Sequence, residues 1–296
     1  KILNEKKTSV YDFVLLGIFA AIGFLSKYLF IYLLVSIFLL FIYFIFIKKI
    51  KKFDFRYLIS LEVFIVLLIP HLIWLYNNDY STIIYGLDRT GTDEFNLLNN
   101  FYNPIIFVLK QIGILLPLFI MVIFLIKKIK FKINKNEKNF IFLFFITLAP
   151  VFLMLLTSIL MGSKIRTMWM TPFYLFLGLF LIYIFQDQIN FKNIKNFIVV
   201  FLFFSILSPA LYSYESISNK DKRTDYPGKE IAKKIQYIWD EDNKDEIDTV
   251  LGDEWVAGNL SYHLKSRPSW GGFITNEKLN SLSKFLCVDN ICVGKK

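Results

Sequence analysis

Three basic residues lie in short breaks between long apolar runs of the chain. Lys27 lies in the break between the first and second runs, and Lys164 and Arg166 lie in the linker 162–166 between the fifth and sixth runs. A cation at such a position could hold a lipid phosphate by charge-assisted hydrogen bonds. It could equally extend from a helix end toward the headgroup layer, with no ligand. We treat the three residues as candidate phosphate contacts and keep the simpler explanation open.

Further polar residues lie near the outer end of the third run. His71 and Trp74 follow Pro70, which can break a helix and free its carbonyl groups. His71 could move a proton or bind a sugar, or a helix neighbour could satisfy it. Trp74 could stack on a sugar ring, or belong to the aromatic belt of the membrane interface.

The long segment 77–103 contains an adjacent acidic pair, Asp93 and Glu94. Loops of this length are often functional, and a carboxylate there could act as a general base. An adjacent pair in a polar loop can also be simply solvated. The sequence contains no His/Cys cluster with metal-ligand spacing, so it predicts no metal site.

Seven apolar runs must position these residues. Most approach the roughly 20 residues that cross a bilayer core, although the first is short, and such segments must be helical because lipid offers backbone amides no partner. The sequence therefore predicts an all-α polytopic membrane protein of about seven spans. The runs are 11–25, 28–47, 57–76, 104–126, 139–160, 168–185 and 197–214.

The loops between these runs alternate between many and few basic residues. Lys and Arg are plentiful after the second, fourth and sixth runs and at the start of the chain. The positive-inside rule makes these loops cytoplasmic, so the turns with Lys27 and Lys164 and everything after Tyr214 are expected outside. Basic loops beside anionic membrane lipids also account for the net charge of +10, and we predict no nucleic-acid partner.

Two domains are expected, a transmembrane domain over 1–214 and an extracytoplasmic domain over 215–296. The second is too polar to span a membrane. Its pattern predicts a helix over about 228–240, a strand over 248–252 and a second helix over 255–264, which together indicate a small α/β domain. Cys287 and Cys292 could form a disulfide if the compartment oxidises, or remain two separate thiols.

Four passages of the chain resemble the polyprenyl-phosphate-sugar-dependent glycosyltransferases of the GT-C superfamily. The closest likeness is to bacterial relatives of protein O-mannosyltransferases and of the aminoarabinose transferase that acts on lipid A. The passages are GIFAAIGFLSKY (17–28), PHLIWLYNNDYSTIIYGLDR (70–89), GSKIRTMWMTPFY (162–174), and RTDYPGK (223–229) with GDEWVAGNLSYHLKSRP (252–268).

The resemblance implies a multi-pass enzyme of the bacterial inner membrane with its active site outside. A hydroxyl of a protein or glycolipid acceptor would attack the sugar of a polyprenyl-phosphate donor with inversion, and the lipid phosphate would leave. Some relatives use a divalent metal, and no other cofactor is implied. By residue, the matching motifs assign donor-phosphate contacts to Lys27, Lys164 and Arg166. Candidate sugar or acceptor contacts are His71, Trp74, Asp79 and Arg89.

The chain also departs from the family pattern. The family's acidic motif lies in the first outer loop, after the first helix, and this chain begins later, at Lys1. We therefore expect the catalytic Asp upstream, regard Asp93 and Glu94 as weak substitutes, and expect this stretch alone to be inactive.

A transporter or lipid flippase remains the alternative function. Lys110 and Gln111 in the fourth run could line a path for a substrate. They lie nearer its outer end, so they fit a groove for a lipid phosphate equally well. The clustering of polar residues at outer helix ends, together with the structured tail, favours the enzyme. The sequence does not identify the sugar or the acceptor.

Overall fold

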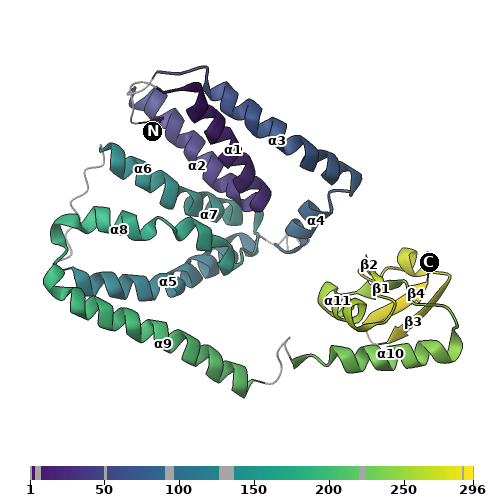
Figure 1. Ribbon diagram of the computed structural model, residues 1–296. Helices are drawn as coiled ribbons and strands as arrows, with labels where there is room; N and C mark the ends of the chain where they lie inside the picture. The colour runs from purple at the N-terminus through teal and green to yellow at the C-terminus, as the bar shows by residue number, and fades with distance from the viewer. Residues whose placement is uncertain are drawn as a thin grey trace. The chain divides into compact units, whose positions relative to one another are not determined.

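The computed structural model describes residues 2–3, 8–49, 52–90, 97–126, 137–219, 225–288 and 290–295. Helices make up 73% of the structure, and a small sheet lies in the C-terminal part (Figure 1). The chain divides into two compact units, Lys1–Ile206 and Leu207–Lys296. The division falls inside helix α9 (Ile194–Ser218), and the boundary predicted at residue 214 lies in the same helix.

Each apolar run forms helix over most of its length, and the helix ends lie within a few residues of the predicted ones. In chain order these elements are α1 (Val10–Ser26), η1 (Tyr28–Phe30), α2 (Ile31–Ile42), η2 (Tyr43–Ile47), α3 (Tyr57–Asn77), α4 (Ser81–Asp88), α5 (Asn99–Leu125), α6 (Lys138–Thr147), α7 (Ala149–Met161), η3 (Thr167–Tyr174), α8 (Leu177–Phe185), η4 (Gln186–Gln188), η5 (Phe191–Asn193) and α9.

The predicted count of seven spans is not confirmed. Among the described residues, four helical stretches are long and apolar enough to cross a membrane: Tyr28–Ile47, α3, α5 and Phe191–Ser218. Two further pairs raise the number to six if each bent pair is one span: α6 with α7, bent by 42°, and η3 with α8, bent by 54°. Pro150 lies in the first turn of α7 and Pro172 lies in η3, and each proline lacks the N–H that would donate a backbone hydrogen bond near its bend. The remaining run is the 17-residue α1.

Helices α1 and α3 lie side by side and touch closely (Figure 1). A Cβ atom on Gly17 would lie 2.5 Å from the carbonyl oxygen of Ser60 and 2.9 Å from Cβ of Val63, so only glycine allows this approach. The hydroxyl of Ser60 donates to the carbonyl of Phe13 across the contact at 2.8 Å. Small residues at a helix contact are the usual means of close packing in membranes.

Arg56 joins the beginnings of the same two helices. Its guanidinium donates to Asp54 at 2.6 Å and to the hydroxyl of Thr8 at 3.0 Å. The hydrogen bonds that Asp54 accepts from the side chain and the backbone amide of Arg56 hold the pKa of its carboxyl below the usual value. Through its bonds to Asp54 and Thr8, Arg56 connects the loop before α3 to the residues that precede α1.

The C-terminal unit is a four-stranded sheet with helices packed on it. Its elements are α10 (Gly228–Asp242), β1 (Thr249–Gly252), α11 (Glu254–His263), β2 (Ser269–Gly272), α12 (Asn276–Asn280), β3 (Lys284–Val288) and β4 (Ile291–Lys295), and the strand order is β2-β1-β4-β3. β1 and β2 are parallel and joined through α11, whereas β4 is antiparallel to both of its neighbours. The two predicted helices and the predicted strand are confirmed, and the hairpin of β3 and β4 is additional.

The core of this unit lies between the sheet and helices α10 and α11. Trp239 is completely buried there, with Ile235, Val250, Leu260 and Val293 among its fellow core residues. Cys287 and Cys292 face each other across the β3–β4 hairpin and form a disulfide, which settles the alternative that the sequence left open.

Candidate functional site

The turn that carries Lys27 is a tight break between α1 and η1. Lys27 adopts an extended conformation, its amide donates to the carbonyl of Gly23, and its carbonyl accepts from the amide of Phe30. A Cβ atom on Gly23 would lie 2.3 Å from the ring of Phe30, so the missing side chain makes room for that ring. The turn leaves the side chain of Lys27 exposed.

The linker 162–166 presents its two basic side chains on one side. Gly162 has a left-handed φ of 62°, and its carbonyl accepts from the side-chain amide of Asn103 at 2.6 Å. Ser163 and Ile165 are buried, whereas Lys164 and Arg166 are exposed. Because successive residues of an extended segment point to opposite sides, residues 164 and 166 share a side, and this pattern puts the two cations on the same face.

One apolar cluster brings the two basic turns together. Ile165 is buried in it with Phe107, Met154, Met170 and Phe173, and Leu29, two residues after Lys27, packs against it. The structure therefore gathers Lys27, Lys164 and Arg166 at one end of the helical unit. None of the three has an ion-pair partner in the described part of the chain.

His71 belongs to a hydrogen-bonded group at the same end. Its Nε2 atom lies 2.7 Å from the hydroxyl of Tyr28, and the same hydroxyl lies 2.9 Å from Oγ1 of Thr82. The partner of His71 is thus 43 residues away, not a neighbour on its own helix. Trp74 stacks on the imidazole with a centroid separation of 5.9 Å. Pro70 does not break the helix, and α3 continues through it to Asn77, in agreement with the single run expected over 57–76.

The chain reverses between α3 and α4 through two left-handed residues. Asp79 and Tyr80 have φ values of 50° and 53°, and the amide of Tyr80 donates back to the carbonyl of Leu75. Asp79 is exposed in this turn. Beyond α4, the guanidinium of Arg89 lies over the ring of Tyr85, 5.0 Å from its centroid.

The segment after α4 meets the second basic turn. The carbonyl of Thr90 accepts from the backbone amide of Lys164 at 2.9 Å. Sequence reasoning missed the contacts made by Tyr28, Thr82 and Thr90. Their partners are 43 to 74 residues distant along the chain, so no local spacing could have revealed them. Asp93 and Glu94 lie outside the described residues.

The described residues contain no group of three or more His, Cys, Asp or Glu side chains that could hold a metal ion. The divalent metal that the sequence resemblance allows therefore has no identified ligand set in these parts of the chain.

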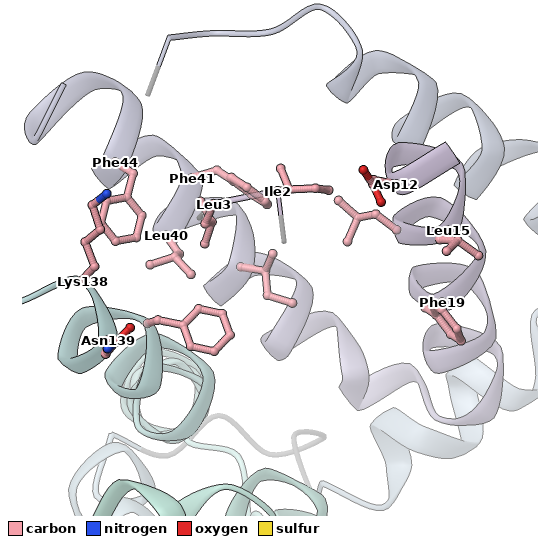
Figure 2. A pocket seen from close by; sticks show the side chains of 13 residues that line it. Ile2, Leu3, Asp12, Leu15, Phe19, Leu40, Phe41, Phe44, Lys138 and Asn139 are labelled. Atoms are coloured by element: carbon pink, nitrogen blue, oxygen red, sulfur yellow. The ribbon is translucent and has the colours of Figure 1, made fainter. Parts of the chain in front are cut away.

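A cavity of about 610 Å³ lies elsewhere in the helical unit, among α1, α2 and α6 (Figure 2). Its walls are mostly apolar, and Figure 2 shows Lys138 and Asp12 in different parts of its lining. Neither the candidate phosphate contacts nor the candidate sugar contacts line this cavity. It is therefore separate from the candidate site.

The polar residues of the fourth predicted run differ in their surroundings. Gln111 is buried and accepts a hydrogen bond from the hydroxyl of Tyr174 at 2.7 Å, whereas Lys110 is exposed. The Gln111–Tyr174 bond joins α5 to η3. Such a bond between helices can serve packing without lining a path.

Comparison with known proteins gives one partial match. Residues 2–74 match the family model described as dolichyl-phosphate-mannose-protein mannosyltransferase. No curated protein and no solved structure matches the chain. The matched quarter of the chain begins before α1 and ends at Trp74 in α3, and it includes Lys27, Tyr28 and His71. In this part the chain is similar to membrane glycosyltransferases of the mannosyltransferase type.

Proposed function

We propose that this protein is a membrane glycosyltransferase that moves a sugar from a polyprenyl-phosphate donor to a hydroxyl of a protein or glycolipid acceptor. The match of residues 2–74 to the mannosyltransferase family carries this proposal. It is supported by the several apolar helices of the described chain and by three exposed cations gathered at one end of the helical unit.

The proposed location is a bacterial inner membrane, with the candidate site and the C-terminal unit outside. The alternation of basic loops supports this orientation. The disulfide between Cys287 and Cys292 also supports it, because disulfides persist mainly in oxidising compartments.

In the proposed reaction the acceptor oxygen forms a bond to the anomeric carbon, and the bond from that carbon to the phosphate oxygen breaks. The phosphate takes the bonding electron pair, so negative charge grows on it as it leaves. Lys27, Lys164 and Arg166 would stabilise this charge by charge-assisted hydrogen bonds. The acceptor proton passes to a base that we assign to no residue.

The test is sugar transfer by the full-length protein in proteoliposomes, with radiolabelled polyprenyl-phosphate mannose as the first donor. Lys164→Ala and Arg166→Ala should each lower donor turnover roughly tenfold to a hundredfold, because a hydrogen bond to a charged group contributes about 1.5–3 kcal/mol. Lys265→Ala is a matched control, since it removes an exposed lysine from the C-terminal unit.

If both linker variants and the control turn over the donor equally fast, Lys164 and Arg166 do not bind the donor phosphate. The better explanation of their exposure is then that the two side chains extend toward the lipid headgroups without a ligand. Transport of the lipid across the bilayer without sugar transfer would instead support the flippase alternative. No observation in the described ranges specifically favours a transporter, since Gln111 bonds to Tyr174 within the helical unit.

A further inference from the structure

Helix α4 is connected at both ends to the two basic turns. Near its start, Thr82 lies 2.9 Å from the hydroxyl of Tyr28, the residue that follows Lys27. Just beyond its end, the carbonyl of Thr90 accepts from the amide of Lys164 at 2.9 Å. The helix therefore bridges the turn of Lys27 and the linker of Lys164.

These end contacts are important because α4 buries little surface of its own. None of its described side chains is buried, and Ile84 and Leu87 remain 51% and 48% exposed. The turn that enters it uses left-handed conformations at Asp79 and Tyr80, which residues other than glycine seldom adopt. Because the turn before α4 has an unfavourable backbone conformation and the helix packs against little else, its position depends on the hydrogen bonds at its ends.

Tyr28 is the centre of this connection. Its hydroxyl has one proton, so it can donate to one neighbour while it accepts from the other. When Nε2 of His71 carries no proton, Tyr28 donates to His71 and accepts from Thr82. When Nε2 is protonated, both hydrogen bonds reverse. In either state the hydroxyl joins α3 and α4 to the turn after α1.

We propose that Tyr28 is a positioning residue and that α4 is a strap that fixes the separation of Lys27 from Lys164. This inference rests on the proposed function, because two cations hold one phosphate only when both side chains reach it together. Charge-assisted hydrogen bonds need short, directed contacts. A misplacement of about 1 Å can therefore cost as much as a hundredfold in rate.

The separation of the turns can be measured without catalysis. Nitroxide labels on Leu25→Cys and Met168→Cys, both exposed positions beside the turns, report it by double electron–electron resonance in proteoliposomes. Tyr28→Phe should broaden or shift the distance distribution. Tyr76→Phe is the control, because that side chain is 71% exposed near the end of the same α3 that carries His71. Identical distributions in the two phenylalanine variants would overturn the strap.

Sugar transfer then tests the positioning role. Tyr28→Phe and Thr82→Val should each lower kcat/KM for the donor about tenfold, whereas Thr82→Ser, which keeps the hydroxyl, should restore it. If Tyr28 acts through the basic turns, Tyr28→Phe should add little to the loss already caused by Lys164→Ala. A further tenfold loss in the Lys164→Ala background would contradict the positioning role.

The two proposals fail in distinguishable ways. A parent protein that transfers no sugar, but whose distance distribution still changes with Tyr28→Phe, would refute the proposed function and support the strap. Normal transfer by the parent, with no effect of Tyr28→Phe on distance or rate, would refute the strap alone.

Discussion

The contact between α1 and α3 allows a sharp test of how the helices pack. In Gly17→Ala the new methyl group would meet the carbonyl oxygen of Ser60 at 2.5 Å and Cβ of Val63 at 2.9 Å. Ordinary contacts are about 3.5–4.0 Å, so the two helices must separate by roughly 1 Å. Overpacking of this kind costs about 1–3 kcal/mol. The carbonyl of Ser60 belongs to the backbone and cannot rotate away as a side chain could. We therefore expect the full cost of the clash to appear in the free energy of unfolding.

Gly113→Ala is the matched control for this substitution. Gly113 lies in α5, and a Cβ atom there would meet nothing within 4 Å. Both substitutions gain the same helix propensity, at most about 1 kcal/mol, so their difference isolates the cost of packing.

The assay is unfolding in mixed micelles by titration with sodium dodecyl sulfate, followed by tryptophan fluorescence. Gly17→Ala should be less stable than Gly113→Ala by about 1–3 kcal/mol. Equal stability of the two variants, or greater stability of Gly17→Ala, would show that α1 and α3 do not meet at Gly17 and would refute the reasoning.

Two further predictions concern orientation and the C-terminal unit. A cysteine placed near Lys130 should resist an impermeant thiol reagent in intact cells, whereas one placed near Lys244 should react. The reverse labelling pattern would put the candidate site in the cytoplasm. Replacement of both cysteines of the β3–β4 pair by serine should destabilise the C-terminal unit by about 2 kcal/mol, because the disulfide restricts the unfolded chain, and an unchanged calorimetric unfolding temperature would contradict this.

The sequence predicted the helices better than it predicted their shapes. Apolar runs dictate helix in lipid, so the bounds of α3 agreed with the expected 57–76 almost to the residue. The bend between α6 and α7 was missed, although Pro150 at the start of α7 was a visible signal. Pro70 has the same chemistry, yet α3 continues through it, so a proline alone does not decide between a break and a continuous helix.

The candidate site shows a similar limit. The short turns around Lys27 and Lys164 were evident from the sequence, because few residues separate the apolar runs there. The contact of Tyr28 with His71 and Thr82 depends on how three elements meet in space, and neither composition nor periodicity encodes it. The exposure of Lys164 beside buried Ile165 likewise follows from the packing of the linker on its apolar cluster.

The position of β4 has a consequence for the order of events during biosynthesis. This strand is the last in the sheet along the chain, yet it lies inside the sheet between β1 and β3, and its Ile291 and Val293 belong to the core. The sheet cannot close until residues 291–295 have left the ribosome and, in the proposed orientation, crossed the membrane. Until then one edge of β1 is unpaired and part of the core around Trp239 is open, which are the features that promote aggregation of folding intermediates. The C-terminal unit must therefore fold after its membrane helices have been made, and a slow export step would prolong its most vulnerable state.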